Sequence, residues 1–485
     1  MNVSIKRILD RIENSALTPG RWIIFFLAIT YTRNILEGAL ERSRVIGAEG
    51  GALQSFQSVF LLYALEWAAL FCVVIIILHY ASSRPILSLL KITLAFFPII
   101  LIVPFVDFIA YFPRGAKVEY VFTLRGYMDA LVFFFVPWKE AGAPAGVRIE
   151  VFISCVLAFL YVLARTEKPV KAALATALIY FFAVSSMCFP VFILLPALAF
   201  VPDFDAFIQA FFAGSADFSM TAKLGIMIFP LLTFSAALAL RLYSADGFRK
   251  ALRLFLLPKT LLFSALAASG FIYTADYSSP FFPALIFAFI LLGALIAVIA
   301  DISPWNSGKT FNPAPFAAAS FFTAILSLLL SFYVFMTVLL AVLLSLAFPE
   351  KKRAITLNLS HRIVYYITAL IVHISGIVFT NGPYLSSIAW EKPSYTALIL
   401  AVTAIAVFVC PKNKAAMTAA SFTGFVLYAA APAIFASPVL AAVSLVCGAA
   451  FAAAVLTCRE ENKKQAILYS TVSIFSVFFA LINRA

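Results

Sequence analysis

Apolar residues run in long unbroken stretches along nearly the whole chain, separated by short polar segments. The stretches are roughly 16–30 residues long, which is the length that a helix needs to cross a bilayer. Strands that cross a membrane would instead alternate apolar and polar side chains. A helix also satisfies its own backbone hydrogen bonds inside hydrocarbon. The pattern therefore predicts an all-α, polytopic bundle of transmembrane helices.

We predict about fifteen spans from these stretches. They cover residues 22–41, 57–80, 87–111, 149–165, 172–200, 222–243, 254–274, 281–301, 315–332, 333–348, 361–380, 394–410, 415–434, 437–457 and 467–483. The stretch MDALVFFFVPW at 128–138 is too short to cross, and we interpret it as re-entrant or interfacial.

Basic residues collect in alternate loops of the second half, near residues 309, 351–353, 412–414 and 459–464. Because cytoplasmic loops of membrane proteins are enriched in Lys and Arg, this alternation supports the span count there. It also predicts that the N-terminus lies in the cytoplasm. The first half alternates less cleanly.

The first 22 residues, MNVSIKRILDRIENSALTPGRW, predict a basic amphipathic helix on the cytoplasmic face. They lack the apolar core and small-residue cleavage site of a signal peptide. The polar segment 241–253 predicts a boundary between two membrane domains. Residues 1–245 would hold six of the spans, with no assigned role, and residues 246–485 the other nine.

Composition supports the same class. The chain has 485 residues, of which 64% are hydrophobic and 12% charged, whereas soluble globular proteins are about 25% charged. We predict an integral, multi-pass protein, in the plasma or inner membrane if the source is prokaryotic. The net charge of +13 fits cytoplasmic loops that meet anionic headgroups, so we expect membrane lipids as partners and no nucleic acid. The cysteines and histidines form no metal-binding pattern.

Polar motifs of the second half follow an informative order. The basic segment LRLFLLPKT (252–260) opens its first span, Asp301 ends the second before NSGKTFNP, and FPEKKRAITLNLSHR (348–362) follows the fourth. This order resembles the UbiA-type intramembrane prenyltransferases, over residues 253–483. The resemblance implies a nine-helix fold around a lipid-facing cavity, with an acid-rich motif after the second helix and a basic loop after the fourth.

The sequence lacks most of the acidic residues of that family's acid-rich motifs. Asp301 corresponds to the leading acid of the first motif, but where other acids belong the sequence has Pro304 and Gly308, or Trp305 and Lys309 if the register shifts by one. The loop after the sixth helix, CPKNKAAM (410–417), has none. Because Mg²⁺ needs carboxylates to hold it against a diphosphate, Asp301 is the one candidate for a catalytic or Mg²⁺-ligating role.

Cationic and amide side chains around Asp301 predict direct binding of a phosphate group. The candidates are Lys259, Asn306, Lys309, Asn312, Lys351, Lys352, Arg353, Lys412 and Lys414. Such a surface suits a polyprenyl monophosphate better than metal-dependent ionisation. The alternative is that these residues only set the orientation of the protein.

Charged residues also interrupt the apolar runs of the first half. Arg33 and Glu37 share a helical face in the first span, and Glu66 and Asp107 lie in later ones. An arginine near the bilayer centre needs a partner or a wet cavity. These residues predict either a buried ion pair that fixes helix packing or a path for a substrate or ion. Pro104 and Pro190 would break or kink their spans.

The leading functional hypothesis is a prenyltransferase-like protein that binds an isoprenoid or polyprenyl-phosphate lipid at a cytoplasmic-facing cavity, with transferase activity left open by the missing acids. The alternatives are a multi-pass transporter or flippase and a non-catalytic membrane scaffold. A transporter would favour two similar halves, and we find no internal repeat.

Overall fold

The computed structural model forms helices and no strands over the residues that it describes. These residues are 3–40, 57–112, 120–136, 143–213, 220–274, 281–303, 313–347, 359–381, 393–408, 414–435, 438–458 and 461–482. The chain divides into two compact units. Unit 1 comprises Met1–Phe248 with Ser279–Phe281, and unit 2 comprises Arg249–Ser278 with Phe282–Ala485.

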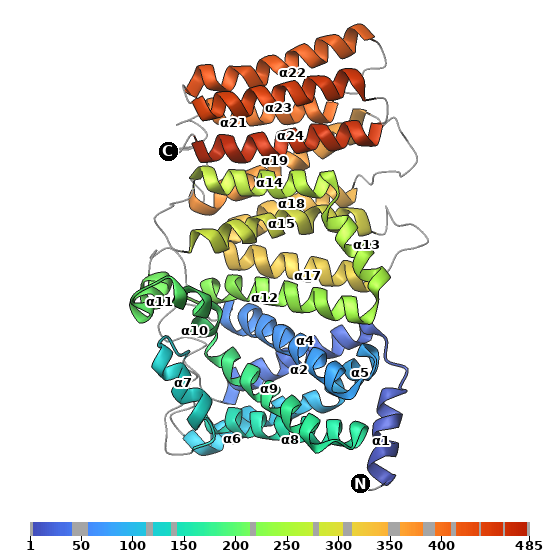
Figure 1. Cartoon of the computed structure of the whole chain (residues 1–485), viewed down its shortest axis with the longest axis vertical. Helices are drawn as coiled ribbons and strands as arrows, with labels where there is room; N and C mark the ends of the chain where they lie inside the picture. The colour runs from blue at the N-terminus through green and yellow to red at the C-terminus, as the bar shows by residue number, and fades with distance from the viewer. Residues whose placement is uncertain are drawn as a thin grey trace. The chain divides into compact units, whose positions relative to one another are not determined.

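Unit 1 is a bundle of helices of very different lengths (Figure 1). Its elements are α1 (Val3–Glu13), α2 (Pro19–Leu40), the π-helix η2 (Gln57–Leu62), α4 (Tyr63–Ser82), α5 (Ile86–Phe96), the 3₁₀-helix η3 (Phe97–Ile102), α6 (Val103–Tyr111), α7 (Leu124–Phe133), α8 (Ala145–Thr166), α9 (Pro169–Met187), α10 (Phe189–Leu194), the 3₁₀-helix η4 (Leu195–Ala199), α11 (Phe204–Ala213) and α12 (Met220–Tyr243).

The core of unit 1 lies among α1, α2, α4, α5, α8 and α9. Phe26, Phe71 and Phe97 are buried there with ring centroids 4.4–5.3 Å apart, within the range of favourable aromatic pairs. The N-terminal amphipathic segment forms α1, as the sequence predicts, and its Leu9 is buried in this same core. Whether α1 faces the cytoplasm stays a prediction.

Unit 2 packs around α14. Its elements are α13 (Ala245–Phe255, which begins in unit 1), α14 (Pro258–Thr274), α15 (Phe282–Ile302), α17 (Pro313–Leu330), α18 (Phe332–Ala347), α19 (Leu359–Asn381), α21 (Pro393–Phe408), α22 (Lys414–Phe435), α23 (Pro438–Thr457) and α24 (Glu461–Ile482). Helix α14 packs against α15, α19 and α24.

Glycines let these helices approach closely. A Cβ on Gly270 of α14 would stand 2.1 Å from the carbonyl oxygen of His373 on α19, and one on Gly293 of α15 would stand 2.4 Å from that of Phe263. Only a residue without a side chain fits such crossings, which are typical of helix pairs in membranes.

Among the described residues, eight segments are long and apolar enough to cross a membrane, which confirms a multi-pass helical membrane protein. They are Phe60–Ser82, Ile86–Tyr111, Ala145–Thr166, Pro169–Met187, Ala222–Tyr243, Phe282–Ile302, Pro438–Thr457 and Lys463–Ile482. Helices α13 and α14, bent by 55°, form a ninth if the pair counts as one span. The other apolar helices in the described ranges include several of 10–17 residues, so fifteen crossings and a prenyltransferase-like fold stay predictions.

Prolines divide one of the predicted spans and change the helix type within another. The run 172–200 does not form one helix, because α9 ends at Met187 and Pro190 lies in the first turn of α10. The run 87–111 is helical throughout but changes to a 3₁₀ turn at η3 and returns to α-helix at α6, where Pro104 lies in the first turn. A proline has no N–H to donate and clashes with the preceding turn, so it starts helices more readily than it continues them.

Candidate functional site

The site predicted in unit 2 is described at two residues. Lys259, in the first turn of α14, and Asp301, near the end of α15, form an ion pair with Nζ and Oδ1 3.3 Å apart. Their side chains are 14% and 19% exposed. The Lys259 ammonium also lies 5.7 Å from the centroid of the Tyr365 ring, within the range of a cation–π contact.

Most of the other predicted residues lie outside the described ranges. These are Asn306, Lys309, Asn312, Lys351, Lys352, Arg353 and Lys412, and Lys414 begins α22 with a side chain that is not described. No group of three His, Cys, Asp or Glu side chains within the described ranges could hold a metal. Asp301 therefore offers Mg²⁺ a single described carboxylate, whose Oδ2 is buried without a hydrogen bond to the described residues.

Unit 1 brings the predicted intramembrane charges of α2 together. Arg33 Nη1 donates to Glu37 Oε2 at 2.8 Å one helical turn away, and both residues are buried. The Arg33 guanidinium lies 5.5 Å from the centroid of the Trp67 ring on α4. The Arg33 guanidinium thus contacts a carboxylate and an aromatic ring inside the bundle, where it has little access to water.

Glu66 and Asp107 take different partners. The Tyr120 hydroxyl donates to Glu66 Oε1 at 2.5 Å. Burial and the neighbouring Glu66 carboxylate raise the pKa of the Tyr120 phenol well above its ordinary value, so this group remains a donor. Asp107 is 1% exposed and accepts the backbone N–H of Gly146, at the start of α8, at 2.6 Å.

Glu150 is an important residue that the sequence did not single out. It lies on α8, is 7% exposed and interacts electrostatically with Arg33, Glu37 and Asp107. Its Oε2 has no hydrogen-bond partner among the described residues. Glu150 is the second residue of the span predicted at 149–165. An acid at that position is expected at the membrane surface, so nothing in the sequence indicated that it is buried.

A cavity of about 100 Å³ lies between these charges. It is lined by Arg33, Glu37, Tyr63, Glu66, Trp67, Leu70, Tyr120, Val147, Glu150, Val151, Ala183, Ser186 and Met187. A second, mainly apolar cavity of about 140 Å³ adjoins it, because Trp67, Leu70 and Glu150 line both. Three carboxylates and one guanidinium thus border the polar cavity.

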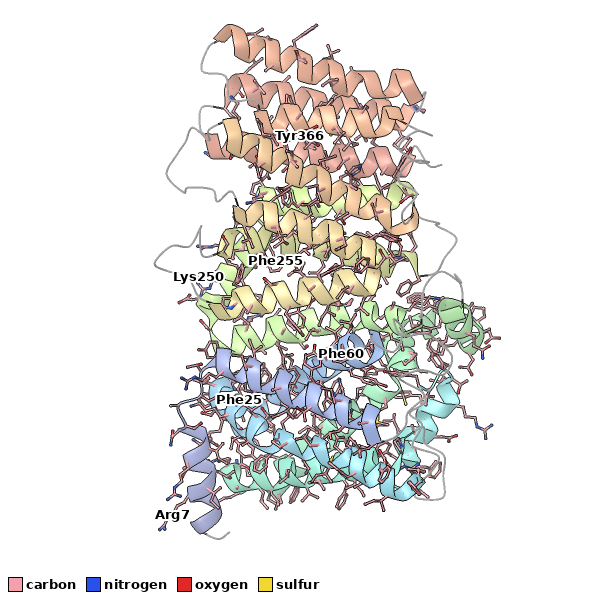
Figure 2. The ribbon with its side chains drawn as sticks, turned by 180° about the vertical axis from the view of Figure 1, so that it is seen from behind. Arg7, Phe25, Phe60, Lys250, Phe255 and Tyr366 are labelled. Carbon is pink, nitrogen blue, oxygen red and sulfur yellow. The ribbon has the colours of Figure 1, made fainter. Side chains whose placement is uncertain are left out.

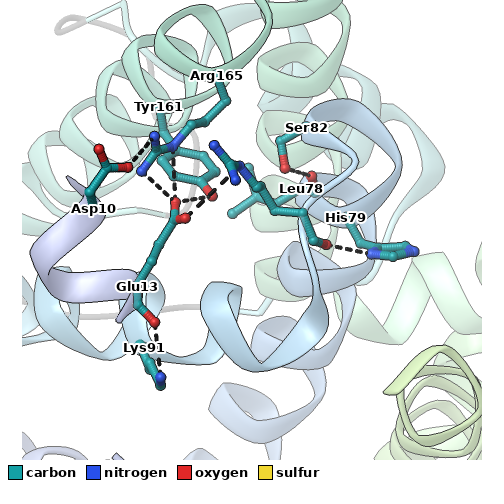
Figure 3. Close-up of polar contacts among 9 residues, drawn as sticks. Asp10, Glu13, Leu78, His79, Ser82, Lys91, Tyr161 and Arg165 are labelled. Carbon is teal, nitrogen blue, oxygen red and sulfur yellow. Dashed lines mark hydrogen bonds and ion pairs between the residues drawn. The ribbon is translucent and has the colours of Figure 1, made fainter. Parts of the chain in front are cut away.

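A polar network joins α1 to Tyr161, which lines the apolar cavity (Figure 3). The Glu13 carboxylate accepts from the Tyr161 hydroxyl at 3.0 Å and from Arg165 Nε at 2.9 Å. Arg165 also pairs with Asp10 at 2.7 Å, and Lys91 donates to the Glu13 backbone carbonyl at 2.9 Å. One glutamate therefore joins the end of α1 to α5 and α8.

Comparisons of the chain with protein-family models, curated proteins and solved structures give no match. The likeness to prenyltransferases thus depends on the motifs quoted above, and function has to be argued from the geometry of the two units.

Proposed function

We propose that unit 1 carries a positively charged species, a proton or small cation, across the membrane. The observation that supports this is the convergence of Glu37, Glu66 and Glu150 on one intramembrane cavity that holds a single arginine. Ionisable residues within membrane spans generally face a protein interior or a wet cavity and mark ion and proton pathways.

The charges around the cavity favour a cation. Arg33 pairs directly with Glu37, which leaves Glu66 and Glu150 as acids without a charged partner at ion-pair distance in the described residues. Aromatic rings of Tyr63, Trp67 and Tyr120 line the same space, and their faces attract cations.

A role restricted to helix packing would explain less. An ion pair that fixes packing needs only Arg33 and Glu37, whereas Glu150 brings a further buried carboxylate whose Oε2 has no described hydrogen-bond donor. A buried carboxylate is costly to leave unpaired. A transient proton or cation at Glu150 would relieve that cost, which is the behaviour that a transport site requires.

The test is charge movement in proteoliposomes on a solid-supported membrane, with concentration jumps of H⁺, Na⁺ and tetramethylammonium. We expect a transient current with at least one of these ions, which Glu150→Gln removes. The matched control Glu167→Gln changes an exposed glutamate with the same chemistry and should conduct as the wild type. Currents no larger than those of protein-free liposomes for all three ions would refute the proposal.

For unit 2 we propose a second function, the binding of an isoprenoid or polyprenyl-phosphate lipid. The Lys259–Asp301 pair supports it, because a lysine ammonium carries three N–H donors and phosphate oxygens accept strong charge-assisted hydrogen bonds from such a group. Mg²⁺ would join the site through Asp301 at most. Transferase activity would require the further residues that the prenyltransferase resemblance implies.

The unit 2 test measures the melting temperature of the purified protein with a short-chain polyprenyl phosphate, with and without Mg²⁺. We expect stabilisation that Lys259→Gln abolishes and that Lys171→Gln, at an exposed lysine of unit 1, leaves unchanged. Equal stabilisation by the corresponding polyprenol, which has no phosphate, would contradict a phosphate site. No shift with either lipid would favour a scaffold.

A further inference from the structure

A large open groove lies on unit 1 between α1, α2 and α5, apart from the cavities described above. Its volume is about 880 Å³. Its wall and floor are apolar, with Ile24, Phe25 and Ile29 from α2 and Leu94 and Ala95 from α5. Ile24 and Phe25 of α2 are 67% and 51% exposed, and Figure 2 shows where Phe25 lies on this helix. In a membrane-spanning bundle such exposed apolar side chains meet lipid chains.

Basic side chains border the same groove. Arg11 of α1, Arg21 of α2 and Lys91 of α5 all line it. Arg11 and Arg21 are exposed, and neither forms an ion pair with an acid among the residues that the structure describes. Lys91 donates to the backbone carbonyl of Glu13, an acceptor that carries no net charge to offset that of the lysine.

The groove has a fixed shape because polar contacts join its walls. Trp22 Nε1 donates to the Leu90 carbonyl at 2.8 Å, which joins α2 to α5. The Lys91–Glu13 bond and the Glu13–Arg165 contacts hold the end of α1 in place beside them. The basic side chains are therefore brought together by the fold rather than by chance proximity on a loose tail.

From this combination we propose that the groove binds one anionic phospholipid. The headgroup phosphate lies between Arg11 and Arg21, and an acyl chain follows Ile24, Phe25 and Ile29 along α2. A zwitterionic lipid carries a compensating positive charge that meets the same cations unfavourably. A free phosphate would leave the apolar floor uncovered. Charge and apolar surface together thus select a lipid with a net negative head.

The experiment is native mass spectrometry of the purified full chain, titrated with phosphatidylglycerol or with phosphatidylcholine of the same acyl chains. We expect one phosphatidylglycerol to bind more tightly than phosphatidylcholine. The Arg11→Gln/Arg21→Gln variant should weaken it roughly thirtyfold, from about 1 kcal/mol for each arginine near the membrane surface and 1.4 kcal/mol for each factor of ten. The matched control Arg125→Gln/Arg241→Gln removes two exposed arginines that do not line the groove and should change affinity less than about twofold, because salt screens charges beyond contact range.

A second variant tests the apolar floor without altering charge. Ala95 is exposed in the groove, and Ala95→Trp should occupy the part of it beside α5 and weaken phosphatidylglycerol binding, whereas Ala95→Ser should not. Equal binding of the two lipids, or an equal loss in the control pair, would mean only unspecific lipid contact and would overturn the proposal. Displacement of phosphatidylglycerol by millimolar inorganic phosphate would identify a phosphate site instead and would overturn it as well.

Discussion

The buried Arg33–Glu37 pair allows a sharp test of how charges are held inside unit 1. Its N–O distance is 2.8 Å, and the two side chains are only 8% and 11% exposed. At an effective dielectric constant near 20 the direct attraction is about 6 kcal/mol. Most of this offsets the cost of removing both charges from water. The net effect of the pair is therefore small, while the loss of one member is costly.

The order of the single variants follows from their neighbours. Arg33→Met leaves Glu37 buried near Glu66 and Glu150, so we expect unfolding free energy to fall by about 3–5 kcal/mol. Glu37→Gln leaves Arg33 beside Trp67 and within electrostatic reach of the other two acids, so we expect a loss of about half that size. The double variant should be no worse than Arg33→Met alone.

The assay is reversible unfolding of the purified protein in mixed micelles, as SDS replaces a mild detergent, with all four members of the mutant cycle measured together. The coupling free energy should be about 2 kcal/mol or more. Additive losses would show that the two residues do not act as a pair. A larger loss for Glu37→Gln than for Arg33→Met would refute the account of surplus negative charge around the cavity.

Three further predictions concern other contacts. Gly270→Leu in unit 2 should lower the unfolding free energy by more than about 3 kcal/mol, because its Cβ would stand 2.1 Å from the His373 carbonyl oxygen. The control Gly247→Leu, at a partly buried helix end, should lower it far less in the same SDS assay. Arg165→Met should release α1 and speed its cleavage by trypsin, and a cleavage rate equal to wild type would count against the network. Lys6 donates to exposed Glu167 and lowers its pKa, so Lys6→Ala should return that pKa toward its ordinary value in an NMR titration.

The long apolar runs predicted the positions of the helices well, because a run that lies in lipid has to be helical to satisfy its backbone hydrogen bonds. The apolar runs alone did not predict where a helix is interrupted, and prolines determine one such position. The span expected at 172–200 is broken beside Pro190, since a ring without an N–H ends one helix and starts another. The number of crossings is harder to predict, because a run of 16 apolar residues fits a short buried helix as well as a spanning one.

The charged site was only partly predictable for a different reason. Arg33 and Glu37 lie four residues apart, so their contact follows from helix geometry alone. Glu66 contacts Tyr120, and Glu150 interacts with Arg33, although the residues of each pair are far apart in the chain. A single sequence gives no information on which distant residues lie close together in the fold. For Asp301 the sequence predicted a cationic environment, and Lys259 is the described part of it.

The π-helical turn at Gln57–Leu62 has a consequence for changes in chain length. A π turn takes more residues per revolution than an α turn, so it behaves as an α-helix with one residue inserted. Deleting one residue there would let the segment form an ordinary α-helix, and the side chains of Glu66 and Trp67 would keep their orientation in the bundle. Unit 1 should therefore tolerate a deletion at this point, whereas the same deletion inside α4 would rotate half of that helix by roughly 100° and turn its inward-facing side chains toward lipid.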